Sequence, residues 1–275
     1  MKALRYGLAA ALVAGAALLL HAYSVAVSDP AVRRATVALP GWPAGAPPVR
    51  ALLVSDIHVA GPDMPPSRLE RLVERMNALS PDIVLIAGDL VSDKRTATRH
   101  YTLAEAVAPL GRLRAPLGIV AVLGNHDHWR STAEARAALK ANGVAVLANE
   151  AVARGPLAIG GLDDDFTGRS DLGATLEALG RAKGARLVLS HSPDPFPQLP
   201  AAVGLMLAGH THCGQIALPL VGPLATMSRH GRRYACGLVA EGGKTLIVGA
   251  GLGTSVLPLR LGARPDMWLI EIGPR

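Results

Sequence analysis

Short, nearly uninterrupted apolar runs recur along the chain from residue 49 onward and alternate with amphipathic segments. The runs occupy residues 49–54, 83–87, 118–123, 144–147, 157–159, 187–189, 205–207, 245–248 and 267–272. Strands that are buried on both faces of a sheet have this composition, and the helices between them supply the covering layers. The pattern therefore predicts an α/β fold.

Two of the intervening segments have the periodicity of amphipathic helices. In residues 67–79 the apolar positions fall on one face, and Ser67 with Glu70 matches a capping box. A second helix is expected to begin at Ser131, with a glutamate three residues later, and to end near Gly143. We therefore expect helices over 67–79 and 131–143.

The amino-terminal segment is apolar from residue 7 to residue 27 and follows Lys2 and Arg5. At about 1.5 Å per residue, a helix of this length crosses a hydrocarbon core of about 30 Å. We therefore expect a signal anchor with a single span. The alternative is a cleaved secretory signal, because Ser24 and Ala26 could frame a cleavage site.

Basic residues on the two flanks of this segment are nearly balanced. Arg33 and Arg34 follow it, whereas the amine of the first residue adds a charge to Lys2 and Arg5 on the other flank. The more positive flank stays inside. We therefore expect a protein of the cell inner membrane whose amino terminus is inside and whose catalytic domain is extracytoplasmic.

Residues 28–48 are rich in proline and glycine, which favours an extended connector over a packed element. A chain of 275 residues has room for one sizeable domain and a short appendage. We therefore divide the chain into a signal anchor or signal peptide at 1–27, a linker at 28–48 and a domain at 49–275.

The charge and the aromatic content limit the partners. The net charge is +7, from 28 Lys and Arg against 21 Asp and Glu, and this favours anionic partners. Aromatic residues make up only 3%, which argues against a protein that stacks nucleic-acid bases. Cys213 and Cys236 are too few for a disulfide framework, and a disulfide between them stays open.

Polar side chains follow five of the expected strands, at the point where each strand ends. They are Asp56 and His58, then Asp89 and Asp93, then Asn125, His126 and Asp127, then His191, and finally His210 and His212. Because strand ends of such a sheet lie along one rim, we expect these side chains to converge there. Carboxylate, amide and imidazole ligands together suit Mn, Fe, Co or Zn.

The five blocks read SDIH, GDLVSD, GNHD, SHSPD and GHTHCGQ, in this order between residues 55 and 215. On these blocks the chain resembles the calcineurin-like metallophosphoesterase superfamily. Its tail, GLGTSVLPLRLGARPDMWLIEI, is similar to the bacterial membrane-anchored branch, which includes phosphodiesterases and some UDP-2,3-diacylglucosamine diphosphatases. The resemblance implies a four-layer sandwich of two central mixed β-sheets flanked by helices, here preceded by a transmembrane or signal helix.

The resemblance also implies two divalent metal ions and a role for each residue of the blocks. One ion is held by Asp56, His58 and His212, the other by Asn125, His191 and His210, and Asp89 bridges both. A hydroxide shared by the two ions attacks the phosphorus. His126 assists the leaving group, and Asp127 orients His126.

Cys213 departs from the family pattern, since relatives commonly carry glycine at that position. A buried thiol is the interpretation we favour, and sensitivity to oxidation or to metal poisoning is the alternative.

The acidic run 163–165 lacks the spacing of a calcium loop and is expected to be a solvated turn. His128 and His230 belong to no block and are expected to be structural.

These features predict a monomeric hydrolase that cleaves phosphodiester or pyrophosphate bonds of a small molecule or a lipid. The expected anchor motivates a substrate that is itself associated with the membrane. Two alternatives remain open: a catalytically silent module that binds the cell envelope, and a nuclease, which this fold also supports.

Overall fold

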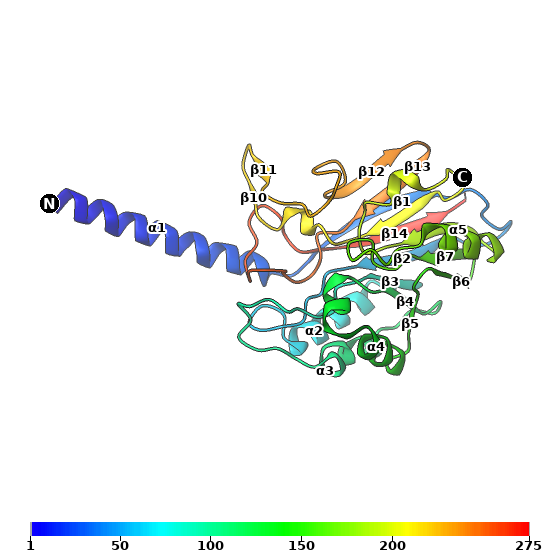
Figure 1. Ribbon diagram of the computed structural model, residues 1–275, viewed down its shortest axis with the longest axis horizontal. Coiled ribbons are helices and arrows are strands. Elements are labelled where there is room, and N and C mark those ends of the chain that lie inside the picture. Colours follow the sequence, from blue (N-terminus) through cyan, green and yellow to red (C-terminus); the bar gives the residue numbers. More distant parts are fainter. Residues whose placement is uncertain (1, 275) are drawn as a thin grey trace.

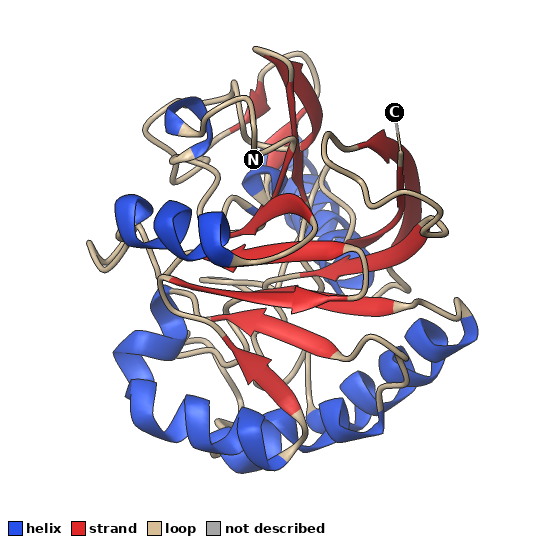
Figure 2. Ribbon diagram, turned by 90° about the vertical axis from the view of Figure 1, so that its right-hand side faces the viewer, coloured by secondary structure: helices blue, strands red, loops and turns tan. Residues whose placement is uncertain are grey.

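The computed structural model describes residues 2–274 and contains two six-stranded sheets packed face to face, with helices on their outer faces. Figure 2 shows the strands in the middle of the molecule and the helices around them. Both sheets combine parallel and antiparallel pairs. The predicted α/β class and the sandwich of two mixed sheets are therefore confirmed.

The first sheet has the order β1-β14-β2-β3-β4-β5, and only β14 and β2 pair antiparallel. Its strands are β1 Ala31–Ala38, β2 Val49–Val54, β3 Ile83–Ala87, β4 Ile119–Val122, β5 Val144–Val146 and β14 Asp266–Gly273. The helical elements beside it are α2 Pro66–Ala78, α3 Leu103–Val107, the short 3-10 helix Ala108–Arg112 and α4 Asn125–Ala141. Apolar residues of these helices and of the strands form one core layer.

The second sheet has the order β12-β13-β9-β8-β7-β6, with antiparallel pairs only at its two edges. Its strands are β6 Glu150–Arg154, β7 Leu157–Gly161, β8 Ala185–Leu189, β9 Leu205–Ala208, β12 Gly237–Glu241 and β13 Lys244–Val248. Helix α5, Leu172–Arg181, packs on β6 and β7, and the hairpin of β10 Ala217–Leu218 and β11 Gly222–Pro223 stands apart.

The central core lies between the two sheets, and it explains why the strands are apolar without interruption. In β2, Leu53 belongs to the core between the sheets, whereas Leu52 and Val54 belong to the core under the helices. Leu85 and Ile86 of β3 divide in the same way. Successive side chains point to opposite faces, so a strand covered on both faces needs apolar residues at every position.

The first predicted helix start is off by one residue and its predicted cap is absent, whereas the predicted start at Ser131 is confirmed as the point where α4 resumes after a kink. Helix α2 begins at Pro66, one residue before the expected cap, and no side chain caps it. Proline suits the first position of a helix because it has no N–H that would lack a partner there. Helix α4 begins at Asn125 and kinks at Ser131, where the Ser131 hydroxyl accepts a bond from the Glu134 amide at 3.3 Å. The sequence signal at Ser131 therefore marks a restart within one helix.

The expected extended connector is also wrong over residues 31–38. These residues form β1, which pairs in parallel with β14 along its whole length. Arg33 supports this pairing, since its Nε donates to the buried Asp266 carboxylate at 2.6 Å. The partner strand lies more than 200 residues later, so local composition carried no sign of it. The division into anchor, linker and domain otherwise stays a prediction.

Helix α1, Lys2–Ala26, is long enough and apolar enough to cross a membrane. It projects from one end of the domain (Figure 1) and is mostly exposed. Only its last turns touch the domain, where Ala22 and Ala26 are buried and the Arg260 amide donates to the Ala22 carbonyl at 3.0 Å.

Candidate dinuclear metal centre

The ends of β2, β3, β4, β8 and β9 meet at one rim, and the seven predicted ligand residues converge there. The first three strands belong to one sheet and the last two to the other, so the site straddles the two sheets. All seven residues are buried: Asp56, His58, Asp89, Asn125, His191, His210 and His212.

One group combines Asp56, His58 and His212. The Nε2 atoms of His58 and His212 lie 3.0 Å apart, and His212 Nε2 lies 3.5 Å from Asp56 Oδ1. The His210 amide donates to both oxygens of Asp56, at 3.0 and 3.1 Å, and holds the carboxylate in place. Three ligand atoms therefore face a common point.

A second group combines Asn125, His191 and His210. His191 Nε2 lies 3.2 Å from Asn125 Oδ1 and 3.1 Å from His210 Nδ1. The Nδ1 of His191 lies 2.7 Å from the Ala87 carbonyl, and the Nε2 of His210 lies 3.2 Å from the Met227 carbonyl. Since a carbonyl only accepts, those nitrogens carry protons, and His191 Nε2 and His210 Nδ1 are left as the atoms that would face a metal.

Asp89 lies between the two groups. Its Oδ2 is 3.4 Å from His58 Nε2 in the first group and 3.2 Å from His191 Nε2 in the second. Its other oxygen accepts a bond from the His126 amide at 2.9 Å. One carboxylate oxygen is thus placed to be shared by two cations.

These spacings fit two divalent ions. Ligand atoms bound to one ion at about 2.1 Å lie about 3.0 to 3.4 Å apart in octahedral or tetrahedral geometry. Six pairs of ligand atoms at the site are separated by 3.0 to 3.5 Å. Lone pairs and carboxylates this close repel one another unless positive charge lies between them. The donor set therefore fits the metals that the sequence predicts, with the choice among Mn, Fe, Co and Zn still a prediction.

The backbone at the site adopts conformations that non-glycine residues rarely take. Five ligand residues have positive φ angles between 48° and 70°: Asp56, His58, Asp89, His210 and His212. Each costs about 1 to 2 kcal/mol relative to ordinary backbone. Such strain persists where the surrounding structure enforces it, and it clusters at functional sites.

Two glycines of the sequence blocks are required by close approach. A Cβ on Gly124 would lie 2.3 Å from Asp89 Oδ1, and a Cβ on Gly209 would lie 2.4 Å from Asp56 Oδ2. Any side chain at either position would displace a carboxylate of the site. The glycines of GNHD and GHTHCGQ therefore serve the ligand geometry directly.

The charges of the site interact strongly in the absence of metal. Burial disfavours the charged form of Asp56 and raises its pKa to about 6. Burial also opposes the His191 imidazolium, but the negative charge and hydrogen bond of Asp89 outweigh it, and the pKa of His191 rises to about 10. For His210, burial and the neighbouring His191 lower the pKa to about 4. Burial holds the pKa of His58 and His212 well below the usual range.

These shifts predict that metal binding displaces one proton above neutral pH. Between pH 7 and 9 Asp56 is ionised and the other three histidines are neutral, whereas His191, with its pKa at about 10, still carries a proton that a metal must remove. Affinity for Mn²⁺ should therefore rise about tenfold per pH unit in this range. Calorimetric titration of metal-free protein would measure it, and an affinity independent of pH would contradict the assignment.

His126 lies beside the two groups, and Asp93 rather than Asp127 contacts its side chain. His126 Nδ1 is bonded to the Asp93 carboxylate, and its Nε2 lies 3.5 Å from the Ser255 hydroxyl. Asp127 instead accepts bonds from the amides of Leu90 at 2.8 Å and Gly124 at 3.0 Å. The predicted orienting role of Asp127 is therefore wrong in its geometry. Asp93 lies in the GDLVSD block, and its position in that block was the sequence signal that could have identified it as the partner of His126.

A cavity of about 420 Å³ opens onto this centre. Its polar side includes Asp89, Asn125, His126, His210 and His212. Its opposite walls are largely apolar and include Trp129, Phe166, Ile216, Leu224, Met227, Val256 and Leu257. A ligand with one polar end and one apolar end would match these two sides.

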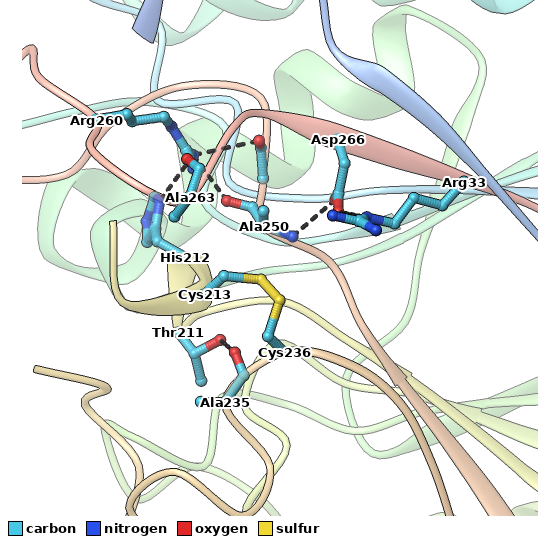
Figure 3. Close-up of a disulfide and its surroundings, with 11 residues drawn as sticks. Arg33, Thr211, His212, Cys213, Ala235, Cys236, Ala250, Arg260, Ala263 and Asp266 are labelled. Atoms are coloured by element: carbon cyan, nitrogen blue, oxygen red, sulfur yellow. Dashed lines mark hydrogen bonds and ion pairs between the residues drawn. A yellow bond between two sulfur atoms is a disulfide. The ribbon is translucent and has the colours of Figure 1, made fainter. Parts of the chain in front are cut away.

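Arg260 is a fully buried arginine behind the first ligand group (Figure 3). Its guanidinium donates to the carbonyls of Ala250 at 2.7 Å and Ala263 at 3.1 Å, and it lies 3.3 Å from His212 Nδ1. Burial lowers the pKa of Arg260 to about 10, so the side chain remains charged at neutral pH. Arg260 therefore fixes the loop that supports His212.

Arg260→Lys should lower the free energy of unfolding by about 2 to 3 kcal/mol. A lysine cannot reproduce the fan of guanidinium N–H donors, so buried carbonyls lose their partners. Urea unfolding of the full chain in detergent would measure the loss. Arg71→Lys is the matched control, because Arg71 is exposed on α2 and makes one bond to the Ser67 carbonyl. Equal unfolding midpoints for the two variants would refute this role of Arg260.

Cys213 forms a disulfide with Cys236, so the favoured interpretation of Cys213 as a free buried thiol is wrong (Figure 3). The Cα atoms are 4.7 Å apart, and the bond closes the segment between residues 213 and 236 at its base. The Thr211 hydroxyl adds a bond to the Ala235 carbonyl at 2.6 Å. This segment supplies Ile216, Leu224 and Met227 to the cavity.

The remaining candidates have structural roles. His128 pairs with Asp163 at 2.8 Å and with the Thr132 hydroxyl, and it does not line the cavity. In the acidic run 163–165, Asp164 is buried and accepts bonds from backbone amides of its own turn, so the expectation of a solvated turn holds only in part. His230 lies 3.3 Å from the Asp194 carbonyl.

Comparison with known proteins gives consistent similarities. A family model described as calcineurin-like phosphoesterase matches residues 49–214. YkuE, an uncharacterised metallophosphoesterase of Bacillus subtilis strain 168, is 34% identical over 74% of this chain and 72% of its own. Phosphodiesterase YaeI of Escherichia coli K12 is 31% identical over 82% of this chain and 83% of its own. A zebrafish (Danio rerio) transmembrane protein with a metallophosphoesterase domain is 29% identical over 94% of this chain, which spans 60% of that relative.

Proposed function

Because the chain belongs to the calcineurin-like phosphoesterase family, we propose that it is a two-metal hydrolase of phosphodiester or pyrophosphate bonds in a membrane-associated substrate. Membership confirms the resemblance drawn from the five sequence blocks, and with it a metal-dependent phosphoesterase activity. The observation that carries the proposal is the position of Asp89 Oδ2 between two groups of ligand atoms.

The proposal assigns each ligand residue as the sequence predicts. Asp56, His58 and His212 would hold one ion, Asn125, His191 and His210 would hold the other, and Asp89 would contact both. When bound, two such ions lower the pKa of a water shared between them and neutralise charge on the phosphate oxygens. Asp89 offsets the repulsion between the two cations.

His126 supplies a proton to the leaving oxygen in this proposal. Its ring faces the cavity that opens onto the ligand groups. Asp93 binds the Nδ1 side of the ring, which aims Nε2 into the cavity. Asp93 therefore acts through His126 as a positioning residue.

The membrane part of the proposal rests on α1 and on the disulfide. Helix α1 is long and apolar enough for a single span. Disulfides persist in oxidising compartments and are rare in the cytosol. Both observations favour a protein of the cell inner membrane whose catalytic domain lies on the extracytoplasmic side. Reporter fusions at the carboxyl terminus test this orientation, and reporter activity in the cytoplasm would overturn it.

Metal removal tests the enzymatic part. The full chain in detergent, supplied with Mn²⁺, should hydrolyse bis-para-nitrophenyl phosphate, and prolonged chelation should lower the rate by at least about 10³-fold because both ions are needed. Adding Mn²⁺ back should restore the activity. A rate that survives chelation with no metal left on the protein would exclude two-metal catalysis, whereas no activity with Mn²⁺ present would favour the silent module.

A further inference from the structure

The exposed large apolar side chains of the domain are not scattered. Of those outside α1, among the residues that the structure describes, six line the cavity, three lie on the β10–β11 hairpin that adjoins it, and Leu238 lies elsewhere. Six of them project from two loops and together form what we call the apolar lip: Leu218, Leu220, Val221, Leu224, Val256 and Leu257. Leu220 is fully exposed and Val256 is 70% exposed. An apolar patch of this kind on a soluble surface marks an interaction site.

The two loops of the apolar lip are tied to each other. The Gln215 side chain donates to the Leu257 carbonyl at 3.0 Å and accepts from the Ser255 amide at 2.8 Å. Gln215 follows the disulfide-bonded Cys213 by two residues, so the base of the first loop is fixed covalently as well. The two loops of the apolar lip are therefore linked to each other at the cavity mouth.

The apolar lip is also continuous with the end of α1. The Ala217 amide donates to the Leu261 carbonyl at 2.7 Å, and the residue before Leu261, Arg260, donates its amide to the Ala22 carbonyl of α1 at 3.0 Å. Figure 1 shows the β10–β11 hairpin on the side of the domain from which α1 projects. A membrane crossed by α1 would therefore lie against this side.

Positive charge flanks the apolar lip. Thr96 donates to the Val256 carbonyl at 2.8 Å, which places the loop 94–100 beside it. Arg95 and Arg99 are exposed on that loop. Apolar side chains beside exposed arginines match a bilayer surface with anionic headgroups, where the apolar side chains enter the acyl region and the arginines bind phosphates.

We propose that the apolar lip is a second membrane contact, which rests the cavity mouth on the bilayer that α1 crosses. The cavity then receives an amphiphilic phosphate whose aliphatic chain lies along Ile216, Leu224 and Val256 while its phosphate reaches His126. The membrane contact follows from the exposed surface and does not require the proposed function, whereas the substrate class rests on the proposed function. A second copy of the chain is the competing occupant of the same surface.

The contact is tested with labels on the full chain in vesicles of phosphatidylcholine and phosphatidylglycerol. The described residues contain no free cysteine, so Leu220→Cys, Val256→Cys and Ala153→Cys can each carry one environment-sensitive dye. Ala153 is the control, because it is exposed on β6 at the end of the domain away from α1 (Figure 1). Lipids brominated on the acyl chains should quench Leu220 and Val256 several times more strongly than Ala153.

Equal quenching at all three positions would overturn the membrane contact. Dye shielding that persists in detergent and grows with protein concentration would also overturn it, because that result identifies a second copy of the chain on the apolar lip. Leu220 does not line the cavity, so its label leaves the reacting groups untouched.

An activity measurement separates the contact from the chemistry. Leu220→Asp should lower hydrolysis of a lipid phosphodiester embedded in vesicles by about tenfold, while hydrolysis of bis-para-nitrophenyl phosphate changes by less than about twofold. Ala153→Asp, which adds the same charge far from the apolar lip, should change neither rate. If Leu220→Asp lowered the hydrolysis of both substrates equally, the proposal of an amphiphilic substrate would be contradicted. If the unmodified protein cleaves neither substrate, the proposed function fails, and the quenching result still decides the membrane contact.

Discussion

Asp89→Asn is expected to lower kcat/KM for bis-para-nitrophenyl phosphate by at least about 10³-fold. Asp89 is the one carboxylate whose oxygen lies within 3.4 Å of ligand nitrogens from both groups. An asparagine keeps the size of the side chain but removes the negative charge that two neighbouring dications need. The variant should therefore lose at least one metal ion, which elemental analysis of the purified protein measures.

A further contact of Asp89 and a matched control make this prediction specific. Asp89 Oδ1 accepts the His126 amide, so the loss of charge also loosens the position of His126. Asp29→Asn is the matched control, because Asp29 is exposed and pairs with Arg75 outside the site. Retention of both metal ions and of activity by Asp89→Asn would remove the basis of the proposed centre.

Much of the ligand set could be predicted because each ligand follows a strand that is recognisable in the sequence from its apolar residues. The run 83–87 is apolar at every position, and Asp89 comes two residues after its end. The same relation holds for Asp56 after β2 and His191 after β8. Parallel strands bring their ends to one rim, so order along the chain was enough to predict convergence. The structure brings these side chains together, and their assignment as metal ligands stays a prediction.

Contacts between distant segments could not be predicted in this way. The strand β1 depends on β14 at the other end of the chain, and its own sequence places two adjacent arginines among small residues. The partner of His126 was misassigned to its neighbour Asp127, since adjacency in sequence does not tell which way two side chains point. The role of Arg260 could not be predicted, because nothing local in the sequence shows that buried carbonyls accept its hydrogen bonds.

His126→Asn is the second large effect, and it should depend on the leaving group. A general acid contributes about 10² to 10⁴-fold, and it matters most when the departing oxygen is a strong base. We therefore expect about a 10³-fold loss in kcat/KM with an alkyl leaving group and only about a tenfold loss with para-nitrophenolate, which departs without protonation. Metal content should not change, because the His126 side chain is assigned to neither ligand group.

Asp93→Asn provides the matched comparison for this role. It removes the charge at His126 Nδ1 but leaves the imidazole in place. Its loss should therefore be smaller than that of His126→Asn and should follow the same dependence on the leaving group. Equal losses with both leaving groups in His126→Asn would assign the residue to phosphate binding instead of proton transfer. The two substitutions together separate the proton donor from the carboxylate that aims it.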